Sequence, residues 1–281
     1  MNIGIVGLGL MGGSFGRTLL KKTNNKVFGY DINPNVMLKG EMLNDYLEPL
    51  TNDNAKELDM LIISVYPEYF KDCLYRFLPL LKKGAIVRDF CGVKRGVVST
   101  MIEASKEYKD LIFIGGHPMA GREFSGIERS TTTLFEKASM IFVNVNADIF
   151  TLDMIKKFYL SLGFSEVVIT TAENHDKMIA FTSQLCHIVS NAFIKNDTAK
   201  EHFGYSAGSY KDLTRVAKLN VQMWTGLMMG NNDKLASELD ELIVNLQKYS
   251  KALKTSDKKS LENLLDEGNQ RKIQIDSRSS K

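Results

Sequence analysis

The feature that most limits what this chain can fold into is a glycine-rich segment at its start. Residues 7–12 fit the pattern G-x-G-x-x-G. The pattern alone is common, but here it follows an apolar run typical of a buried strand and precedes a helical pattern. In that place the three glycines permit a tight turn, a close approach of phosphate to the backbone, and close packing of helix on strand. The segment predicts a dinucleotide site formed by Gly7, Leu8, Gly9, Leu10, Met11 and Gly12.

A carboxylate at the end of the next expected strand narrows the choice of cofactor. Asp31 follows Gly12 by 19 residues. A carboxylate there can accept hydrogen bonds from both ribose hydroxyls of NAD and would repel the extra phosphate of NADP, so we expect NAD. The alternative is an ordinary turn with an incidental aspartate. At the end of a third strand, Ser64, Val65 and Tyr66 are expected to line the cofactor, although a plain strand-to-helix turn explains them equally well.

Short strand patterns alternate with helical patterns along the first 170 residues. We expect strands at 2–7, 26–30, 60–65, 85–89, 112–115, 141–145 and 167–169, and helices at 10–22, 34–43, 67–81 and 148–162. This alternation predicts an α/β fold whose doubly wound sheet is mainly parallel, a Rossmann domain.

From residue 170 onward only helical patterns remain. Helices are expected at 170–195, 210–229 and 233–253, the first of them with Thr170 and Glu173 at capping-box spacing. The polar tail from residue 268 is expected to be frayed. We therefore predict an NAD-binding Rossmann domain over residues 1–170 and an all-helical domain over 171–281.

Composition excludes several classes of protein. The net charge is only +3, without a concentrated basic run, so neither nucleic acid nor a membrane is an expected partner. The apolar N-terminus lacks the basic leader of a signal peptide, and no apolar run reaches the length of about 18 residues that a membrane span needs. Cys73, Cys91 and Cys186 form no paired motif, so reduced thiols and a cytoplasmic location are expected.

A histidine follows the strand expected at 112–115. The sequence there is Gly116-His117-Pro118, which places an imidazole on a stiff turn at the carboxyl edge of the sheet. Ligands bind at that edge in open α/β folds. A lone histidine is more often structural, but this position, and the suitability of imidazole for proton transfer near neutral pH, favour a catalytic role.

The helix expected at 170–195 carries further polar groups on one face. At about 100° per residue, His175, Ile179, Ser183 and His187 fall within an arc of about 120°. A substrate pocket and a polar seam between helices explain this face equally well. The spacing of the two histidines, with no third ligand in evidence, argues against zinc, so no metal is expected.

These motifs together resemble the prephenate and arogenate dehydrogenase family. The most specific is GGHPMAGRExSG at residues 115–126, and GLGLMGGS at 7–14, His175-Asp176, SQLCH at 183–187 and DLTR at 212–215 with Trp224 agree with it. The resemblance extends to about residue 265. It implies an NAD-dependent enzyme of tyrosine biosynthesis that oxidises a cyclohexadienol with loss of carbon dioxide.

The resemblance also implies roles for single residues. His117 would take the proton of the ring hydroxyl as hydride leaves the same carbon. Arg215 would bind the substrate carboxylate through two parallel hydrogen bonds, although an ion pair with Asp212 is the alternative. Further roles fall to seven residues: Arg122, Ser183, His187 and Gly92 in substrate binding, Glu123 in gating or orienting the pocket, and His175-Asp176 behind them.

Two positions depart from the family pattern. Gly92 stands where members often have a serine, near the nicotinamide, so a water or the backbone would serve there; Gln184 stands where a histidine is usual. These changes leave the reaction class intact but put the rate and the side-chain preference in doubt. Between prephenate and arogenate we expect prephenate, by analogy with stand-alone members of the family.

Two other functions are open. A β-hydroxyacid dehydrogenase or imine reductase would need a lysine on the long helix, where Lys177 and Lys195 lie in no recognisable motif. A non-catalytic NAD-sensing module would need neither the His-Pro segment nor the arginine. Abundant Met and Leu over residues 223–253 predict a homodimer formed through the helical domain.

Overall fold

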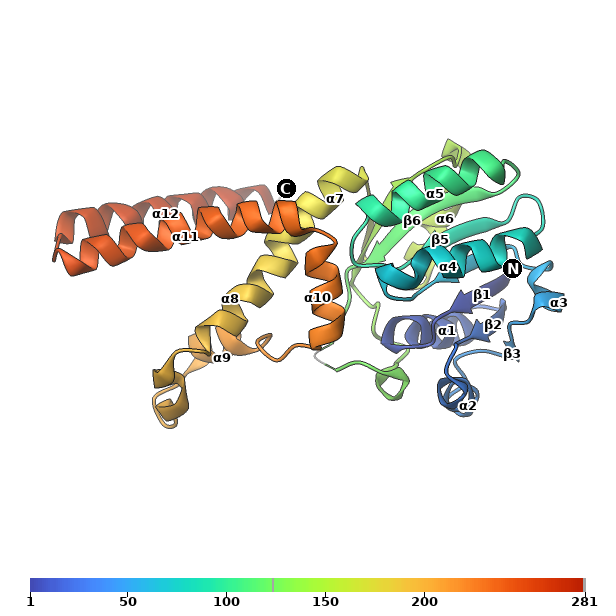
Figure 1. Cartoon of the computed structure of the whole chain (residues 1–281), viewed down its shortest axis with the longest axis horizontal. Helices are drawn as coiled ribbons and strands as arrows, with labels where there is room; N and C mark the ends of the chain where they lie inside the picture. The colour runs from blue at the N-terminus through green and yellow to red at the C-terminus, as the bar shows by residue number, and fades with distance from the viewer. Residues whose placement is uncertain (123, 280–281) are drawn as a thin grey trace. The chain divides into compact units, whose positions relative to one another are not determined.

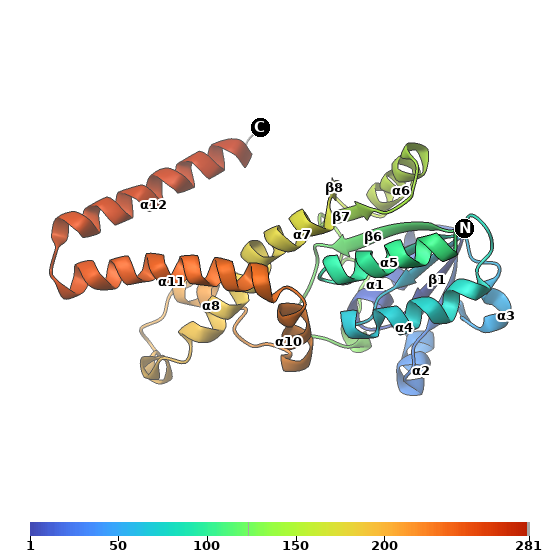
Figure 2. The same cartoon turned by 45° about the horizontal axis from the view of Figure 1, so that its top comes forward.

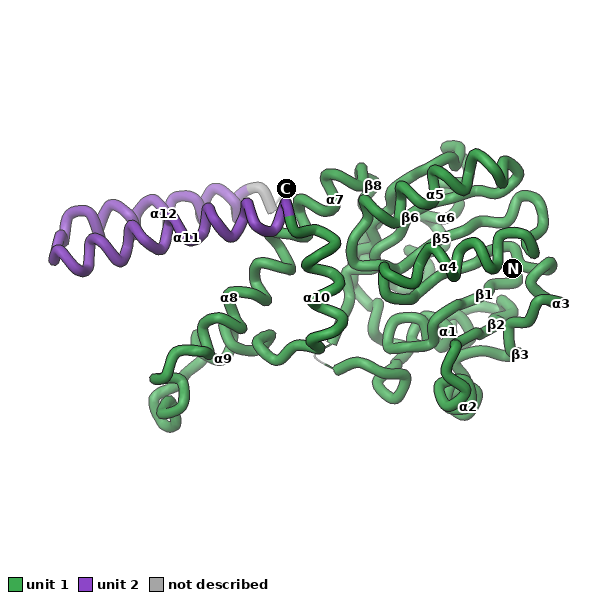
Figure 3. Tube along the Cα trace, viewed as in Figure 1, with its two compact units in different colours: residues 1–232 green, residues 233–281 purple. Residues whose placement is uncertain are grey.

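The computed structural model describes residues 1–122 and 124–279 (Figure 1). The chain divides into two compact units, Met1–Asn232 and Asp233–Lys281 (Figure 3). The domain boundary expected at residue 170 falls between the last strand and the following helix. The two compact units divide after Asn232 instead, so the domain boundary at residue 170 stays a prediction.

An eight-stranded sheet forms the centre of the first unit. Its strands are β1 (Asn2–Val6), β2 (Lys26–Tyr30), β3 (Glu48–Pro49), β4 (Met60–Ile63), β5 (Ile86–Asp89), β6 (Ile112–Pro118), β7 (Ser139–Asn144) and β8 (Glu166–Thr170). Their order is β3-β2-β1-β4-β5-β6-β7-β8, and every neighbouring pair is parallel except β6 and β7. The first six strands have the Rossmann order, so the expected α/β class with a mainly parallel sheet is confirmed.

Helices cover both faces of this sheet (Figures 1 and 2). On one face, α4 (Pro67–Phe77) and α5 (Arg95–Glu107) contribute Phe70, Leu74 and Met101 to an apolar cluster. On the other face, α1 (Leu10–Lys22) and α6 (Ile149–Ser161) contribute Phe15 and Tyr159 to a second cluster. The remaining short helices of this region are α2 (Pro34–Met42), α3 (Asn52–Ala55), η1 (Leu78–Leu80) and η2 (Ile127–Arg129).

Strand β6 continues three residues beyond its expected end at 115. Its pairing with β5 ends at Ile114, but antiparallel pairing with β7 continues, with His117 opposite Ile141 and Pro118 opposite Met140. The prediction that His117 lies on a turn is therefore wrong. The antiparallel neighbour supplies the ladder that extends the strand, and this fixes the backbone of His117.

The long helix after the sheet is interrupted by a wider turn. α7 (Ala172–Ile179), the π-helical segment η3 (Ala180–Leu185) and α8 (Cys186–Phe193) follow one another without a gap. Thr171, not Thr170, caps the helix by accepting a hydrogen bond from the amide of Asn174 at 3.2 Å. A π turn holds an extra residue and rotates the rest of the helix by about 100°, so the expected 120° arc does not hold beyond Ile179.

Another expectation for the helical region is wrong. The single helix expected at 210–229 is two helices, α9 (Gly208–Thr214) and α10 (Val221–Met229), preceded by η4 (Asp197–Glu201). Asn220 begins α10 by accepting from the amide of Met223 at 3.1 Å, a cap that the apolar pattern does not reveal.

The second unit contains two helices, α11 (Asn232–Lys254) and α12 (Lys258–Ser279). The unit begins at Asp233, the second residue of α11. The tail expected to be frayed from residue 268 is helical to Ser279. Ion pairs one turn apart, Glu267 with Arg271 and Lys272 with Asp276, stabilise that part of α12. Among the described residues, no helix combines the length and the apolar character needed to span a bilayer.

Candidate active site

The glycine-rich loop joins β1 to α1 and lies against the end of β4. Gly7 has φ +89°, and a Cβ added to it would lie 2.4 Å from the carbonyl oxygen of Ser64. A Cβ on Gly12 would lie 1.9 Å from the carbonyl oxygen of Gly7, whereas a Cβ on Gly9 would meet nothing within 4 Å. Two glycines are therefore required by the fold. Gly9 has a different effect, because it leaves the backbone open at the N-terminus of α1, where no side chain caps the helix. Such an end can hold a pyrophosphate.

Asp31 lies directly after β2, beside this loop. Its carboxylate accepts hydrogen bonds from the amide of Leu8 at 2.9 Å and from the amide of Asn33 at 2.9 Å. Each oxygen keeps a further lone pair for a ligand donor. The backbone bonds fix the carboxylate next to the loop, and the residues fit the ribose and pyrophosphate of a dinucleotide.

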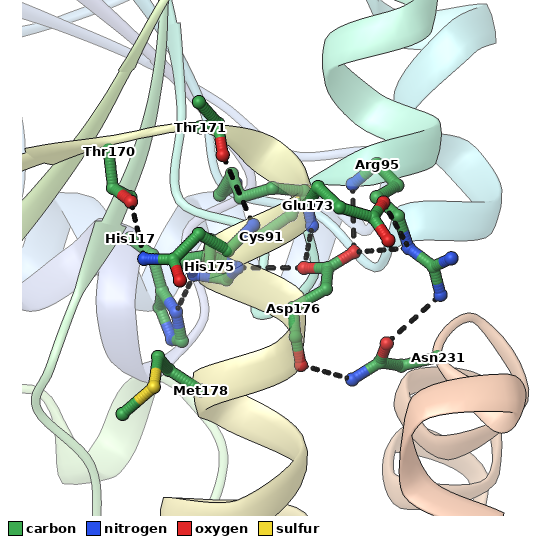
Figure 4. Close-up of polar contacts among 12 residues, drawn as sticks. Cys91, Arg95, His117, Thr170, Thr171, Glu173, His175, Asp176, Met178 and Asn231 are labelled. Carbon is green, nitrogen blue, oxygen red and sulfur yellow. Dashed lines mark hydrogen bonds and ion pairs between the residues drawn. The ribbon is translucent and has the colours of Figure 1, made fainter. Parts of the chain in front are cut away.

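His117 begins a chain of three polar side chains (Figure 4). Its Nδ1 lies 2.9 Å from Nε2 of His175, and Nδ1 of His175 lies 2.7 Å from Oδ1 of Asp176. His117 comes from β6, and the other two come from α7. His175 and Asp176 are buried.

The hydrogen bonds assign the protons of this chain. The Asp176 carboxylate accepts, so Nδ1 of His175 carries a proton and donates. In neutral His175 the other nitrogen, Nε2, then accepts the proton that Nδ1 of His117 donates. Nε2 of His117 is left with a free lone pair. The arrangement therefore presents a proton acceptor whose ring orientation is fixed from behind, as expected of a general base.

The electrostatic surroundings keep both rings neutral. Burial, with smaller contributions from the nearby His175 and Lys94, lowers the pKa of His117 well below 6.5. Burial also lowers the pKa of His175, against the opposing effect of its hydrogen bond to Asp176. Burial alone would raise the pKa of Asp176, but hydrogen bonds from His175 and from the amides of Arg95 and Lys94 lower it overall. Neutral imidazoles beside an ionised carboxylate match the assigned protons.

A second carboxylate fixes the ends of β5 and β6. Asp89 accepts from the amide of Gly116 at 2.9 Å and from the amide of Cys91 at 2.8 Å, and it forms an ion pair with Lys94. Both charged side chains are fully buried. Sequence reasoning assigned no role to this pair, although Asp89 and Lys94 flank the segment at the strand end. Their bonds hold Gly116, directly before the catalytic-histidine candidate, and the loop that follows β5.

Gln184 and Asn231 extend the network to α10. The Asn231 amide donates to the carbonyl of Asp176 at 2.8 Å and to the Gln184 side chain at 2.9 Å, while Arg95 donates to the Asn231 oxygen at 3.1 Å. Gln184 in turn donates to the carbonyl of Leu227 at 3.0 Å. The amide at position 184 thus connects the long helix to the end of α10. Asn231 is a residue that the sequence patterns did not single out.

A second cluster gathers around His187. Its Nδ1 donates to the carbonyl of Ser183 at 2.8 Å, and its ring centroid lies 3.9 Å from that of Trp224. Burial lowers the pKa of His187, and the nearby charge of Arg215 lowers it further. The structure therefore places the carbonyl of Ser183 and the charge of Arg215 close to His187, and these are three residues that the family resemblance assigns to the substrate.

Other candidates are placed differently. Arg122 is exposed, and Glu123 lies outside the described residues. Lys177 and Lys195 are exposed, which does not suit the lysine of a hydroxyacid dehydrogenase. Burial raises the pKa of the Cys91 thiol well above 9.0, so it stays protonated. All three cysteines are free thiols, and the described part of the chain contains no cluster of three metal-binding side chains.

Comparison with known proteins gives matches along nearly the whole chain. Residues 15–168 match the family model "Prephenate dehydrogenase, nucleotide-binding domain", and residues 171–267 match "Prephenate dehydrogenase, dimerization domain". A cyclohexadienyl dehydrogenase of Zymomonas mobilis is 27% identical over 272 residues, covering 91% of this chain and 89% of the relative. A prephenate dehydrogenase of Lactococcus lactis is 26% identical, covering 94% and 74%.

A similar solved structure is the prephenate dehydrogenase of A. aeolicus in complex with hydroxyphenyl propionate and NAD+. It has a TM-score of 0.83 and 27% identity, and the match covers 98% of both chains.

Proposed function

This chain belongs to the prephenate dehydrogenase family, and we propose that it catalyses the NAD-dependent oxidative decarboxylation of prephenate to 4-hydroxyphenylpyruvate. The observation that carries the proposal is the free Nε2 of His117 at the carboxyl edge of a Rossmann sheet, oriented by His175 and Asp176. Family relatives that act on cyclohexadienyl substrates support the reaction class.

His117 is the catalytic base in this proposal. Its Nε2 accepts the proton of the ring hydroxyl, and the hydrogen bond from its Nδ1 to His175 stabilises the ring as it becomes charged. His175 and Asp176 are positioning residues, because they act on the substrate only through His117. Loss of the ring carboxylate as carbon dioxide makes the ring aromatic, so the protein mainly orients the hydroxyl and removes its proton.

The cofactor fits the open loop. NAD, when bound, supplies the acceptor for the hydride that leaves the hydroxyl-bearing carbon. We propose that the backbone from Gly7 to Gly12 holds the pyrophosphate, that Asp31 accepts from the ribose hydroxyls, and that Ser64, Val65 and Tyr66 line the edge of the site.

The direct test uses purified protein with NAD and each of the two candidate substrates. NADH formation with prephenate at a higher kcat/KM than with arogenate supports the proposal. A reversed preference would assign the chain to arogenate, and no NADH with either would leave the NAD-sensing module as the better description. Calorimetric titration with NAD alone distinguishes an inactive protein that binds cofactor from a damaged one.

Arg215 is proposed to bind a substrate carboxylate beside Ser183 and His187. Arg215→Lys keeps the charge but loses the planar pair of donors, so we expect KM for prephenate to rise by roughly 10- to 100-fold, with a smaller change in kcat. Lys218→Ala, which removes an exposed charge three residues away, is the matched control. An unchanged KM in Arg215→Lys would remove this residue from the substrate site.

The activity should depend on pH in one direction over the neutral range. The base must be neutral, and burial lowers the pKa of His117 well below 6.5. We therefore expect kcat/KM to be level from about pH 7 upward and to fall about tenfold per pH unit only below the lowered pKa. Thermal melting over the same pH range distinguishes this fall of kcat/KM at low pH, the acid limb of the profile, from unfolding. An acid limb centred above pH 7 would contradict the assigned base.

We also propose that residues 1–170 bind the cofactor, and that residues 171–281 complete the substrate pocket and form a homodimer. The match of residues 171–267 to a dimerization domain supports this. Exposed apolar side chains of the second unit fit the same proposal: Ile243, Val244, Leu246, Leu253, Leu265, Ile273 and Ile275.

A further inference from the structure

Position 92 lies close to both His117 and α10. A Cβ added to Gly92 would lie 3.9 Å from Nε2 of His117 and 3.0 Å from Cδ2 of Leu227. Gly92 follows β5, and Leu227 lies on α10. A side chain at position 92 would therefore contact both the isobutyl group of Leu227 and the atom that takes the proton.

Space, rather than backbone conformation, restricts the residue at position 92. Gly92 is not among the glycines with positive φ, so an L-residue could adopt its backbone conformation. A methyl group there, however, would be in tighter contact with Leu227 than side chains normally are. The side chain of Leu227 occupies the volume that a larger residue at 92 would need.

Leu227 is held in this place by the network that orients the histidine. Its carbonyl accepts from Gln184 at 3.0 Å, and Gln184 accepts from Asn231, which also binds the carbonyl of Asp176. Asn231 is completely buried. The end of α10 is therefore fixed relative to His175 and Asp176, which holds the backbone of Leu227 in place beside position 92.

We propose that Leu227 is a specificity-determining residue, matched in size by Gly92, that forms an apolar wall beside the ring carbon bearing the hydroxyl. This inference rests on the proposed function. An isobutyl group at that place excludes water from Nε2 and accepts the unsubstituted edge of a six-membered ring. It disfavours rings that carry a substituent next to the hydroxyl, because the helix that carries Leu227 is held by hydrogen bonds and packed side chains yield little to added volume.

The affinity for phenols that are not turned over tests whether Leu227 forms this apolar wall. Trp224 is the single tryptophan of the chain and lies three residues before Leu227 on α10, so its fluorescence can report ligands that bind beside this helix. With NAD present, we expect the wild type to bind 4-hydroxyphenylpyruvate at least about tenfold more tightly than its 3-methyl analogue, and Leu227→Ala to bind the two within about threefold. Val221→Ala, an exposed position on the same helix, should keep the wild-type ratio. Equal affinity of the wild type for the two phenols, or an unchanged ratio in Leu227→Ala, overturns the inference.

A double-mutant cycle tests the size match. Gly92→Ala should lower kcat/KM by at least about tenfold when Leu227 is present, but by less than about threefold in the Leu227→Ala background, where the methyl group has room. Equal losses of kcat/KM in both backgrounds overturn the size match.

If the wild type forms no NADH, the proposed function fails, whereas the ratio of the two affinities still decides whether Leu227 selects the ring. If Gly92→Ala does not fold alone but folds with Leu227→Ala, melting curves show the same coupling.

Discussion

Replacing His117 by asparagine is expected to reduce kcat by about 10³-fold, within the range usual for loss of a general base. Asparagine can still donate from its amide toward Nε2 of His175, so the hydrogen bond behind the ring has a substitute. What it lacks is the lone pair of Nε2, the atom assigned to take the hydroxyl proton. Initial rates of NADH formation at saturating prephenate and NAD measure the effect.

The binding of NAD and the melting temperature should stay unchanged in this variant. His202→Asn is a matched control, because His202 stacks on Phe203 and Tyr210 and takes no part in the network of His117. Undiminished turnover by His117→Asn would show that another group removes the proton. Equal losses in both variants would point to general damage rather than to a missing base.

Two alanine substitutions in the glycine-rich loop should separate protein stability from cofactor binding. A Cβ on Gly12 would overlap the carbonyl oxygen of Gly7 at 1.9 Å, and neither backbone can move away. We expect Gly12→Ala to destabilise the protein by roughly 3 kcal/mol, which corresponds to a fall of about 6–12 °C in the melting temperature.

Gly9→Ala is the counterpart, because its Cβ would meet nothing within 4 Å and the backbone of Gly9 is extended. Its melting temperature should stay near that of the wild type. Its affinity for NAD should fall at least about tenfold, since the methyl group occupies the path of the pyrophosphate to the backbone. Calorimetry and thermal melting on both variants measure the two effects. Normal NAD binding by Gly9→Ala would mean that the cofactor lies elsewhere.

Most of the fold could be predicted because its signals are local. A strand followed by G-x-G-x-x-G and a helix identifies the first βαβ unit within about 30 residues, and alternating patterns indicate the other parallel strands. One error occurred where a distant neighbour decides, because β6 extends past residue 115 to pair with β7. The break between α9 and α10 has a local cause, the cap at Asn220, which the apolar pattern does not reveal.

The active site divides in the same way. The sequence by itself predicted the cofactor loop, the role of Asp31 and the candidacy of His117, because each was expected directly after a strand. Only the tertiary structure placed His175 against His117, 58 residues away, and Leu227 against Gly92. The π-helical turn at Ala180–Leu185 rotates the long helix out of the regular period on which a sequence argument relies. Which nitrogen of His117 is free, and which side chain faces it, depend on contacts between segments distant in the chain, and no local pattern encodes such contacts.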